Sequence, residues 1–289
     1  MFIPVADFNY ELNLQFLKRS PKELLHRLEG DAVLKVLKID NEKILLRIRP
    51  GQDRIIVDCL NTTPGPVTQS AIKNYITEWF DLETDLKPFY TMASGDKILQ
   101  GLVKKYRGYR IIGQPDLFES IIWAVIGQQI NLQFAYTLKH RFVEKFGERL
   151  FWNNESFYLF PEPKLVAGLT DEVLLEQQFS RQKSKYIIGI AEMFASGEIS
   201  KEKLQGLDFE ESKEILMKVR GIGNWTANYA LMKTFRHPNA FPLEDAGIHQ
   251  AIKALKKMDR KPTLDEVKRV FKKYKGWEAY ATLYLWKSL

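Results

Sequence analysis

The stretch Val219–Asp245 reads VRGIGNWTANYALMKTFRHPNAFPLED and decides the fold around it. Gly221 and Gly223 separate two segments with helical patterning, 209–219 and 224–233. The link between these segments is so short that it allows only a tight hairpin. Glycine tolerates positive φ and lets a partner approach the bare backbone. The sequence therefore predicts a helix, a hairpin turn and a second helix.

Two interpretations of this turn stay open on its residues alone. The N-terminus of the second helix offers unpaired N–H groups and the positive end of a dipole, which suits a phosphate. In the other interpretation, the turn is an ordinary helix connection whose glycines serve geometry only. A lone Gly-x-Gly does not separate the two.

The residues around the turn favour the first interpretation, because they resemble a known family. V-R-G-I-G-x-W-T-A-N-Y resembles the helix-hairpin-helix of the base-excision DNA glycosylases, and F-P-L-E-D resembles the loop and aspartate that complete that signature. Within this family the chain looks most like the AlkA-type 3-methyladenine DNA glycosylase II group. Segments 115–147 and 160–195 resemble further helices of that group, and the resemblance covers roughly 96–289.

The resemblance implies that Asp245 is the catalytic residue. Cleavage of an N-glycosidic bond builds positive charge on the sugar, and a nearby carboxylate stabilises this charge and orients or deprotonates the attacking water. One aspartate suffices when alkylation has made the base a good leaving group. On its residues alone, Asp245 also fits a helix N-cap after Pro242, and Glu244 is the alternative carboxylate.

Trp225 bears on the type of reaction. In the family members that also cut the strand, a lysine stands two residues after the second hairpin glycine and forms a Schiff base with the sugar. Trp225 occupies that position here, and neither Lys218 nor Lys233 matches it. The resemblance therefore implies a monofunctional glycosylase. An oxidised-guanine glycosylase/lyase needs that lysine, and a non-catalytic helix-hairpin-helix DNA-binding protein does not need Asp245.

The resemblance also implies a base pocket and a gap-filling turn, because a damaged base must leave the duplex to be cut. Tyr229 and Trp286 match aromatic pocket positions, and Trp225 joins them. Gln128 and Gln129 match the turn that enters the DNA gap, although the AlkA pattern has an apolar wedge at Gln129. On the residues alone, each aromatic also fits a core position, and the two glutamines fit a polar helix end.

The remaining site predictions concern the hairpin. The residues expected to bind DNA are Arg220, Gly221, Ile222, Gly223, Asn224 and Thr226, together with Gln128 and Gln129. The resemblance implies that the backbone carbonyls of Met217, Val219 and Ile222 hold a monovalent cation, Na⁺ or K⁺. No cofactor is expected to be required, and the expected partner of a monomeric protein is double-stranded DNA with alkylated bases.

Composition agrees with a nucleic-acid enzyme. The chain has 43 Lys and Arg against 36 Asp and Glu, a formal net charge of +7. Segment 251–289 alone holds 11 basic and 4 acidic residues, which is the electrostatic footprint of phosphate binding. The single cysteine, Cys59, excludes an intrachain disulfide and a four-cysteine iron–sulfur cluster. No secretory signal or long apolar run is present, which predicts a cytoplasmic protein without membrane contact.

The chain divides into two predicted domains of an α+β protein. Residues 1–95 carry strand-like runs at 33–39, 43–49 and 54–60, separated by turns at 40–41 and 50–52, and predict an antiparallel sheet with a helix at 67–81. Residues 96–289 predict a helical glycosylase domain with the helix-hairpin-helix at 209–233. Its candidate helices are 96–107, 116–127, 131–146, 163–168, 171–178, 181–196, 209–219, 224–234, 244–257, 263–274 and 276–288.

Overall fold

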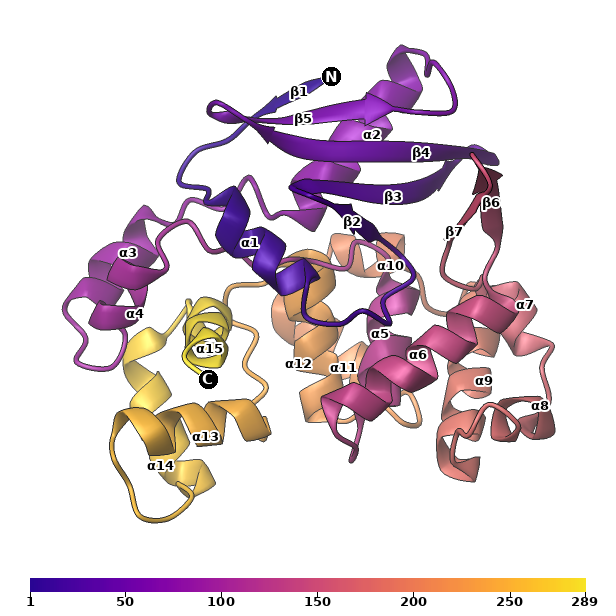
Figure 1. The fold of residues 1–289 in the computed structure, drawn as a ribbon. Helices are drawn as coiled ribbons and strands as arrows, with labels where there is room; N and C mark the ends of the chain where they lie inside the picture. Colours follow the sequence, from indigo (N-terminus) through magenta and orange to yellow (C-terminus); the bar gives the residue numbers. More distant parts are fainter.

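The computed structural model describes all residues from 1 to 289 and has an α+β fold. A five-stranded antiparallel sheet with the strand order β1-β5-β4-β3-β2 forms one end of the molecule (Figure 1). Helices α1 (Tyr10–Leu17) and α2 (Pro66–Trp79) pack on this sheet through a cluster of 15 buried residues. The strands are β1 (Phe2–Pro4), β2 (Arg27–Glu29), β3 (Ala32–Ile39), β4 (Glu42–Gly51) and β5 (Arg54–Cys59).

The three predicted strands are confirmed as β3, β4 and β5. Asp40 and Asn41 form the predicted turn between β3 and β4 with positive φ of 48° and 66°. The second predicted turn is displaced, because Gly51 still belongs to β4 and Asp53 takes the positive φ. The sequence does not predict β1 and β2, since strands of 3 residues show no alternation to detect, and it does not predict α1.

The rest of the chain is mainly helical, and every predicted helix is present with ends that differ by a few residues. The helices are α3 (Lys87–Ser94), α4 (Gln100–Lys105), α5 (Leu117–Gly127), α6 (Leu132–Phe146), α7 (Pro163–Ala167), α8 (Asp171–Leu175), α9 (Arg181–Ala195), α10 (Lys201–Gln205), α11 (Phe209–Met217), α12 (Asn224–Ala230), α13 (Ala246–Leu255), α14 (Leu264–Phe271) and α15 (Glu278–Lys287). A π-helical turn, Leu231–Phe235, extends α12, and a 3₁₀ turn, Lys272–Tyr274, extends α14.

The sequence does not predict α3, α10 or the short hairpin of β6 (Arg149–Trp152) and β7 (Glu155–Tyr158). The hairpin lies inside the half of the chain where helical patterning dominates. Phe157 of β7 packs with Leu34, Val36 and Leu45 of the large sheet, so the hairpin joins the two halves of the molecule. Its apolar residues serve this contact between distant segments, which a local pattern does not reveal.

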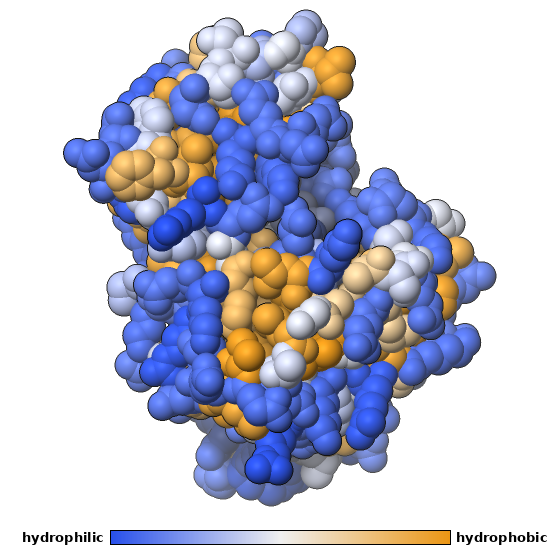
Figure 2. All heavy atoms as spheres, turned by 90° about the vertical axis from the view of Figure 1, so that its right-hand side faces the viewer, coloured by the Kyte–Doolittle hydropathy of each residue, from blue (hydrophilic) through white to orange (hydrophobic).

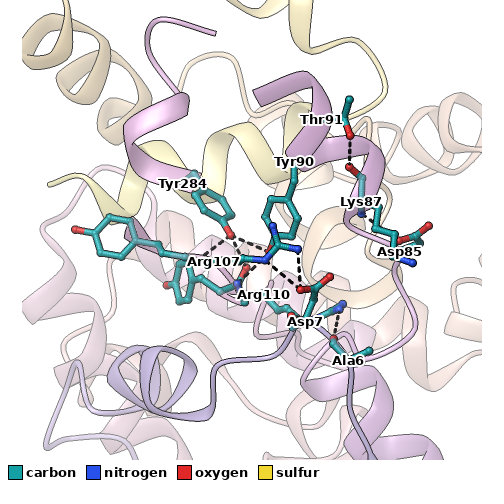
Figure 3. A network of polar contacts seen from close by, with 12 residues as sticks. Ala6, Asp7, Asp85, Lys87, Tyr90, Thr91, Arg107, Arg110 and Tyr284 are labelled. Carbon is teal, nitrogen blue, oxygen red and sulfur yellow. Dashed lines mark hydrogen bonds and ion pairs between the residues drawn. The ribbon is translucent and has the colours of Figure 1, made fainter. Parts of the chain in front are cut away.

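A buried arginine also fastens the two halves together (Figure 3). Arg110 is 3% exposed, and its guanidinium donates to the carbonyls of Asp81 at 2.6 Å, Thr84 at 2.9 Å, Ala6 at 2.9 Å and Asp7 at 3.3 Å. A buried charge is tolerated when its donors are satisfied in this way. The segment before α1 is thereby fixed to the segment that leads into α5.

The buried core of the helical half begins before the predicted domain boundary at residue 95. A cluster of 52 buried residues includes Phe89, Tyr90 and Ala93 of α3, which pack with α15 rather than with the sheet. The division into 1–95 and 96–289 stays a prediction.

The face that carries α7, α8 and α9 is mainly hydrophilic with an apolar area in its helical half (Figure 2). Leu165 of α7 is 46% exposed, and Phe151 of β6 is 66% exposed. None of the helices has both the length and the apolar character that a membrane crossing requires.

Candidate active site

The predicted hairpin lies between α11 and α12. A capping box begins α11, since the Asp208 and Glu211 side chains each accept from the other residue's N–H group. Gly221 has a φ of +97°, and a Cβ there would lie 2.5 Å from the Tyr186 ring, so only glycine fits. At Gly223, nothing lies within 4 Å of the Cβ position. The start of α12 therefore faces open space.

The hairpin side chains predicted to bind DNA differ in exposure. Arg220 is exposed, whereas Ile222 and Thr226 are only 4% and 2% exposed. The Asn224 amide donates to both carboxylate oxygens of Glu244 at 3.0 Å. Arg220 is therefore the side chain of this turn most open to a partner, while Ile222 and Thr226 offer backbone groups.

Gln128 and Gln129 directly follow α5 and have different surroundings. The Gln128 Nε2 donates to the Gly221 carbonyl at 2.9 Å and to the Thr226 hydroxyl at 3.0 Å. Gln129 is exposed and has a positive φ of 57°. Gln128 thus braces the hairpin from inside, and Gln129 is the glutamine that projects from the protein.

Asp245 receives three hydrogen bonds from uncharged N–H groups. Its Oδ1 accepts from the Ile248 backbone at 3.0 Å and from the Trp286 indole at 2.7 Å. Its Oδ2 accepts from the Trp225 indole at 3.0 Å. Asp245 is the N-cap of α13 and is half-buried. The cap and the oriented carboxylate are compatible, because the cap uses only one of the two oxygens.

Gly247 makes this arrangement possible, and the sequence analysis does not identify it. A Cβ at Gly247 would lie 2.8 Å from the Trp286 Cδ1 and 3.0 Å from both the Trp286 Nε1 and the Asp245 Oδ1. Any larger residue would therefore displace the indole from the carboxylate. The available signal was a glycine in the first turn of a predicted helix, where it carries a cost in stability.

The predicted pocket aromatics meet next to Asp245. Trp225 and Tyr229 lie one turn apart on α12, and their rings stack with centroids 5.2 Å apart and an interplanar angle of 19°. The Tyr229 hydroxyl accepts from the Trp123 indole at 3.0 Å, and burial raises the pKa of Tyr229. Trp286 reaches Asp245 from α15. The two indoles on Asp245 thus come from distant segments of the chain.

Residues 122–276 match the model of the HhH-GPD superfamily base excision DNA repair proteins. The chain belongs to the HhH-GPD superfamily. Residues 26–121 match the model of the 8-oxoguanine DNA glycosylase N-terminal domain.

Several relatives are similar over nearly their whole length. A DNA-3-methyladenine glycosylase of Bacillus subtilis (strain 168) is 44% identical over 286 residues, 98% of this chain and 94% of that protein. The structure of a 3-methyladenine DNA glycosylase from Archaeoglobus fulgidus matches with a TM-score of 0.86 and 25% identity, over 99% of this chain and 97% of that one. The structure of an 8-oxoguanine glycosylase/lyase from Clostridium acetobutylicum in complex with DNA matches with a TM-score of 0.78 and 19% identity, over 100% of this chain and 97% of that one. At this identity the match shows a shared fold alone.

The two lysines near the HhH-GPD hairpin differ in position. Lys218 is exposed at the end of α11. Lys233 lies two turns beyond Trp225, is 2% exposed, and donates to the Ile112 carbonyl. Burial holds the pKa of Lys233 well below its usual range. Its ammonium also lies 4.5 Å from the centre of the Phe16 ring, on the side of α12 that faces the N-terminal half.

The candidate cation ligands are neutral oxygens of the hairpin backbone. The Val219 carbonyl already accepts from the Ile222 N–H at 3.0 Å, and the second lone pair of a carbonyl allows a further contact. No cluster of three or more His, Cys, Asp or Glu side chains is close enough to hold a metal ion. The carbonyls of Met217, Val219 and Ile222 fit a monovalent cation in their chemistry.

The basic C-terminal segment forms an open groove next to the loop that leads to Asp245. This groove has a volume of about 510 Å³ and is lined by Lys268, Arg269, Lys272, Lys275, Glu278, Phe241 and Phe271. Its four cations lie at or near α14, where they are exposed. A groove with this surplus of positive charge suits a nucleic-acid backbone.

The residues that support the site from behind have little signal in the sequence. Trp123 lies in α5, where the sequence pattern indicates only a buried core helix, yet its indole N–H donates to the Tyr229 hydroxyl. Asn228 accepts from the Phe241 N–H at 2.7 Å and donates to the Asn224 carbonyl at 2.9 Å, which ties the loop before Asp245 to α12. A buried polar residue inside a helix was the only signal for Asn228.

Proposed function

We propose that this protein is a monofunctional DNA glycosylase that excises alkylated purines from double-stranded DNA. Its substrates are 3-methyladenine, 7-methylguanine and hypoxanthine, and it hydrolyses their N-glycosidic bonds. The products are the free base and an intact strand with an abasic site. The protein acts as a monomer.

The observation that carries this proposal is the Asp245 carboxylate between two indoles. All its hydrogen bonds come from uncharged groups, so no protein cation neutralises it through them. The positive charge that develops on the sugar supplies the missing counter-charge. The same carboxylate orients the attacking water and takes up its proton. Fixed indole donors keep the carboxylate in position while the bond breaks.

The aromatic groups beside Asp245 suit a flipped, cationic base. A cation positioned over an electron-rich ring is attracted by the ring quadrupole. Trp225 and Tyr229 present a stacked pair on α12, and Trp286 lies opposite on α15. Gln129 fills the gap that the flipped base leaves, because Gln128 is engaged by the hairpin. The hairpin holds the neighbouring phosphates and a Na⁺ or K⁺ ion.

The absence of an amine at position 225 supports a reaction without a covalent intermediate. The Trp225 side chain cannot form a Schiff base, and Lys233 is buried and bonded to the Ile112 carbonyl. Water is therefore the nucleophile. Borohydride added during turnover is expected to trap no protein–DNA adduct, and a trapped adduct would contradict the monofunctional mechanism.

The decisive experiment measures the bases that the protein releases from methylated genomic DNA by mass spectrometry. Asp245→Asn serves as the matched variant, because asparagine also caps a helix. The wild type is expected to release 3-methyladenine and 7-methylguanine, and Asp245→Asn to release them at least about a thousand-fold more slowly with unchanged DNA affinity. Equal release by both proteins would remove Asp245 from the mechanism.

Removal of oxidised guanine is the second candidate function. The match of residues 26–121 to an 8-oxoguanine glycosylase domain favours it, whereas Trp225 stands against the lyase chemistry of that group. A duplex with a single 8-oxoguanine tests it directly. Release of 8-oxoguanine without alkylated bases would replace the proposed substrate class. Binding without release of any base would indicate a non-catalytic DNA-binding protein.

A further inference from the structure

Arg19 lies in the N-terminal half of the chain, just after α1. This helix spans the space between α15 and α6, since Gln15 accepts from Lys287 of α15 at 2.8 Å and Arg19 donates to the Tyr136 hydroxyl of α6. Figure 1 shows α1 beneath the sheet and next to the helical half. Arg19 is exposed, and its guanidinium lies over the Phe16 and Tyr136 rings.

The Arg19 guanidinium is held in place on one side and free on the other. Its Nε donates to the Tyr136 hydroxyl, and its Cζ lies 3.9 Å from the centre of the Phe16 ring and 5.4 Å from that of Tyr136. These contacts fix the plane of the group. Neither terminal amino group has a hydrogen-bond partner in the protein, so a rigid pair of donors remains for a ligand.

A short chain of contacts connects Arg19 to the aromatic groups beside Asp245. The Tyr136 ring packs on Trp123 with centroids 4.9 Å apart, and Trp123 donates to the Tyr229 hydroxyl at 3.0 Å. Tyr229 in turn stacks on Trp225. Arg19 therefore lies at the end of the aromatic stack that is opposite to Asp245.

The positive charge of Arg19 affects the pKa of two tyrosines, one on α12 and one that packs against α15. Burial raises the pKa of Tyr229 on α12, and the Arg19 charge opposes that rise. Burial also raises the pKa of Tyr109 to about 12, again opposed by Arg19. Tyr109 packs on Tyr284 of α15 with centroids 6.2 Å apart. The α1 region thus contacts α15 through Gln15 and is linked to α12 through Arg19, Tyr136 and Trp123.

We propose that Arg19 is a specificity residue that binds the C6 carbonyl edge of a flipped purine. This inference rests on the proposed function. A guanidinium has only donors, so it pairs with the O6 and N7 acceptors of a purine and gains nothing from an N6 amino group. Neutral hypoxanthine offers both acceptors, 7-methylguanine keeps only O6, and 3-methyladenine keeps only N7 and presents a donor amino group in place of O6. Arg19 therefore favours hypoxanthine most and 3-methyladenine least.

The test is the ratio of single-turnover excision rates for hypoxanthine, in a synthetic duplex, and 3-methyladenine, in methylated DNA. Arg19→Leu is expected to lower this ratio about ten- to one-hundred-fold, the effect of losing a charged donor. Arg19→Lys keeps the charge without the paired donors and is expected to lower the ratio by less. Lys18→Leu removes an exposed cation from the adjacent position and is expected to leave the ratio unchanged.

Tyr136→Phe provides a second approach that leaves Arg19 in the chain. It removes only the hydroxyl that accepts from the Arg19 Nε, so the ratio is expected to fall a few-fold. Thermal unfolding of each variant identifies any that fail to fold. If the folded Arg19 variants and Tyr136→Phe all keep the wild-type ratio, Arg19 does not contact the base.

Two other outcomes are equally informative. An equal loss of both rates together with weaker binding to undamaged DNA would make Arg19 a phosphate contact, which overturns the proposal. A wild-type protein that releases neither base would show instead that the proposed function is wrong. The two failures are therefore distinguishable within one set of measurements.

Discussion

Two aspartates of this molecule, Asp245 and Asp96, both accept hydrogen bonds from aromatic side chains, yet their surroundings differ in charge. Asp245 at the candidate site is half-buried and accepts from two indoles and one backbone N–H. The Asp96 side chain, where α14 and α15 meet the helical core, is 6% exposed and pairs with the Lys273 ammonium and the Tyr274 hydroxyl.

The difference separates a carboxylate that stabilises the fold from a carboxylate that is a catalytic candidate. A buried charge without a counter-charge is costly, so Asp96 is paired with a cation. Asp245 is oriented by neutral donors, so the proposed mechanism lets its charge act on the positive charge that develops on the sugar. An aspartate bonded by aromatic groups is therefore a catalytic candidate when those groups are uncharged and the site is open.

The largest expected effect is a separation of activity from stability. Asp245→Asn is expected to lower base excision at least about a thousand-fold with little change in the free energy of unfolding. Asp96→Asn is expected to keep excision while it lowers the free energy of unfolding by about 1–3 kcal/mol, because Lys273 loses its partner. Excision kinetics and urea unfolding of both variants measure this. Loss of activity in both would mean that the two aspartates are not functionally distinct.

The Glu23 carboxylate, which pairs with Lys139 of α6, is expected to make the free energy of unfolding depend on pH. Burial alone would raise the pKa of Glu23, but the Lys139 ammonium at 2.9 Å lowers it from 4.5 to about 2. Since the folded-state pKa is the lower one, this stabilisation is complete above 4.5 and is lost as the pH falls toward about 2. The wild type is expected to lose about 2–3 kcal/mol more than Glu23→Gln over this window.

Urea unfolding at a series of pH values measures this difference. Glu144→Gln is the control, because the Glu144 side chain is 58% exposed and its only ionic contact is with His140 at 3.7 Å. Parallel loss of stability in the wild type and in Glu23→Gln would show that the Glu23–Lys139 pair does not anchor the N-terminal half.

The sequence could predict what local backbone geometry and spacing determine. The hairpin requires glycine at Gly221, and α11 and α12 lie on its two sides where the helical pattern predicts them. The fold class followed in the same way, because β3, β4, β5 and most helices show clear periodicity. The resemblance to the glycosylases then indicated which aspartate and which tryptophans to examine.

Contacts between distant segments could not be predicted. Gln128 stays a predicted DNA contact, but its hydrogen bonds to Gly221 and Thr226 join residues 93 and 98 positions apart and have no local signal. The same limit hid the bond from Trp123 to Tyr229, which spans 106 residues. At Asp245, the N-cap and catalytic interpretations appeared to compete, whereas the carboxylate has enough lone pairs for both.

A third expected effect tests the role of Gly247 in the indole–carboxylate contact. Gly247→Ala is expected to lower base excision about ten-fold, because its Cβ would lie 2.8 Å from the Trp286 ring and 3.0 Å from the Asp245 Oδ1. Gly189→Ala is the matched control within α9, where nothing lies within 4 Å of the Cβ position. Single-turnover excision rates of Gly247→Ala and Gly189→Ala measure this difference. Full activity of Gly247→Ala would mean that the Trp286–Asp245 bond is dispensable.

The smallest expected effect concerns charges that are neither buried nor at the reacting bond. Lys272→Gln combined with Lys275→Gln is expected to weaken binding to undamaged DNA a few-fold, because both residues line the basic groove. The slope of log affinity against log salt should fall by about 2, since each phosphate contact contributes about 0.9. Lys73→Gln combined with Lys164→Gln removes two exposed cations from α2 and α7 and is expected to leave the slope unchanged. Equal slopes in the two double variants would exclude the groove as the DNA surface. A change confined to the groove variant would show that the groove cations attract the strand, which leaves Asp245 for the sugar.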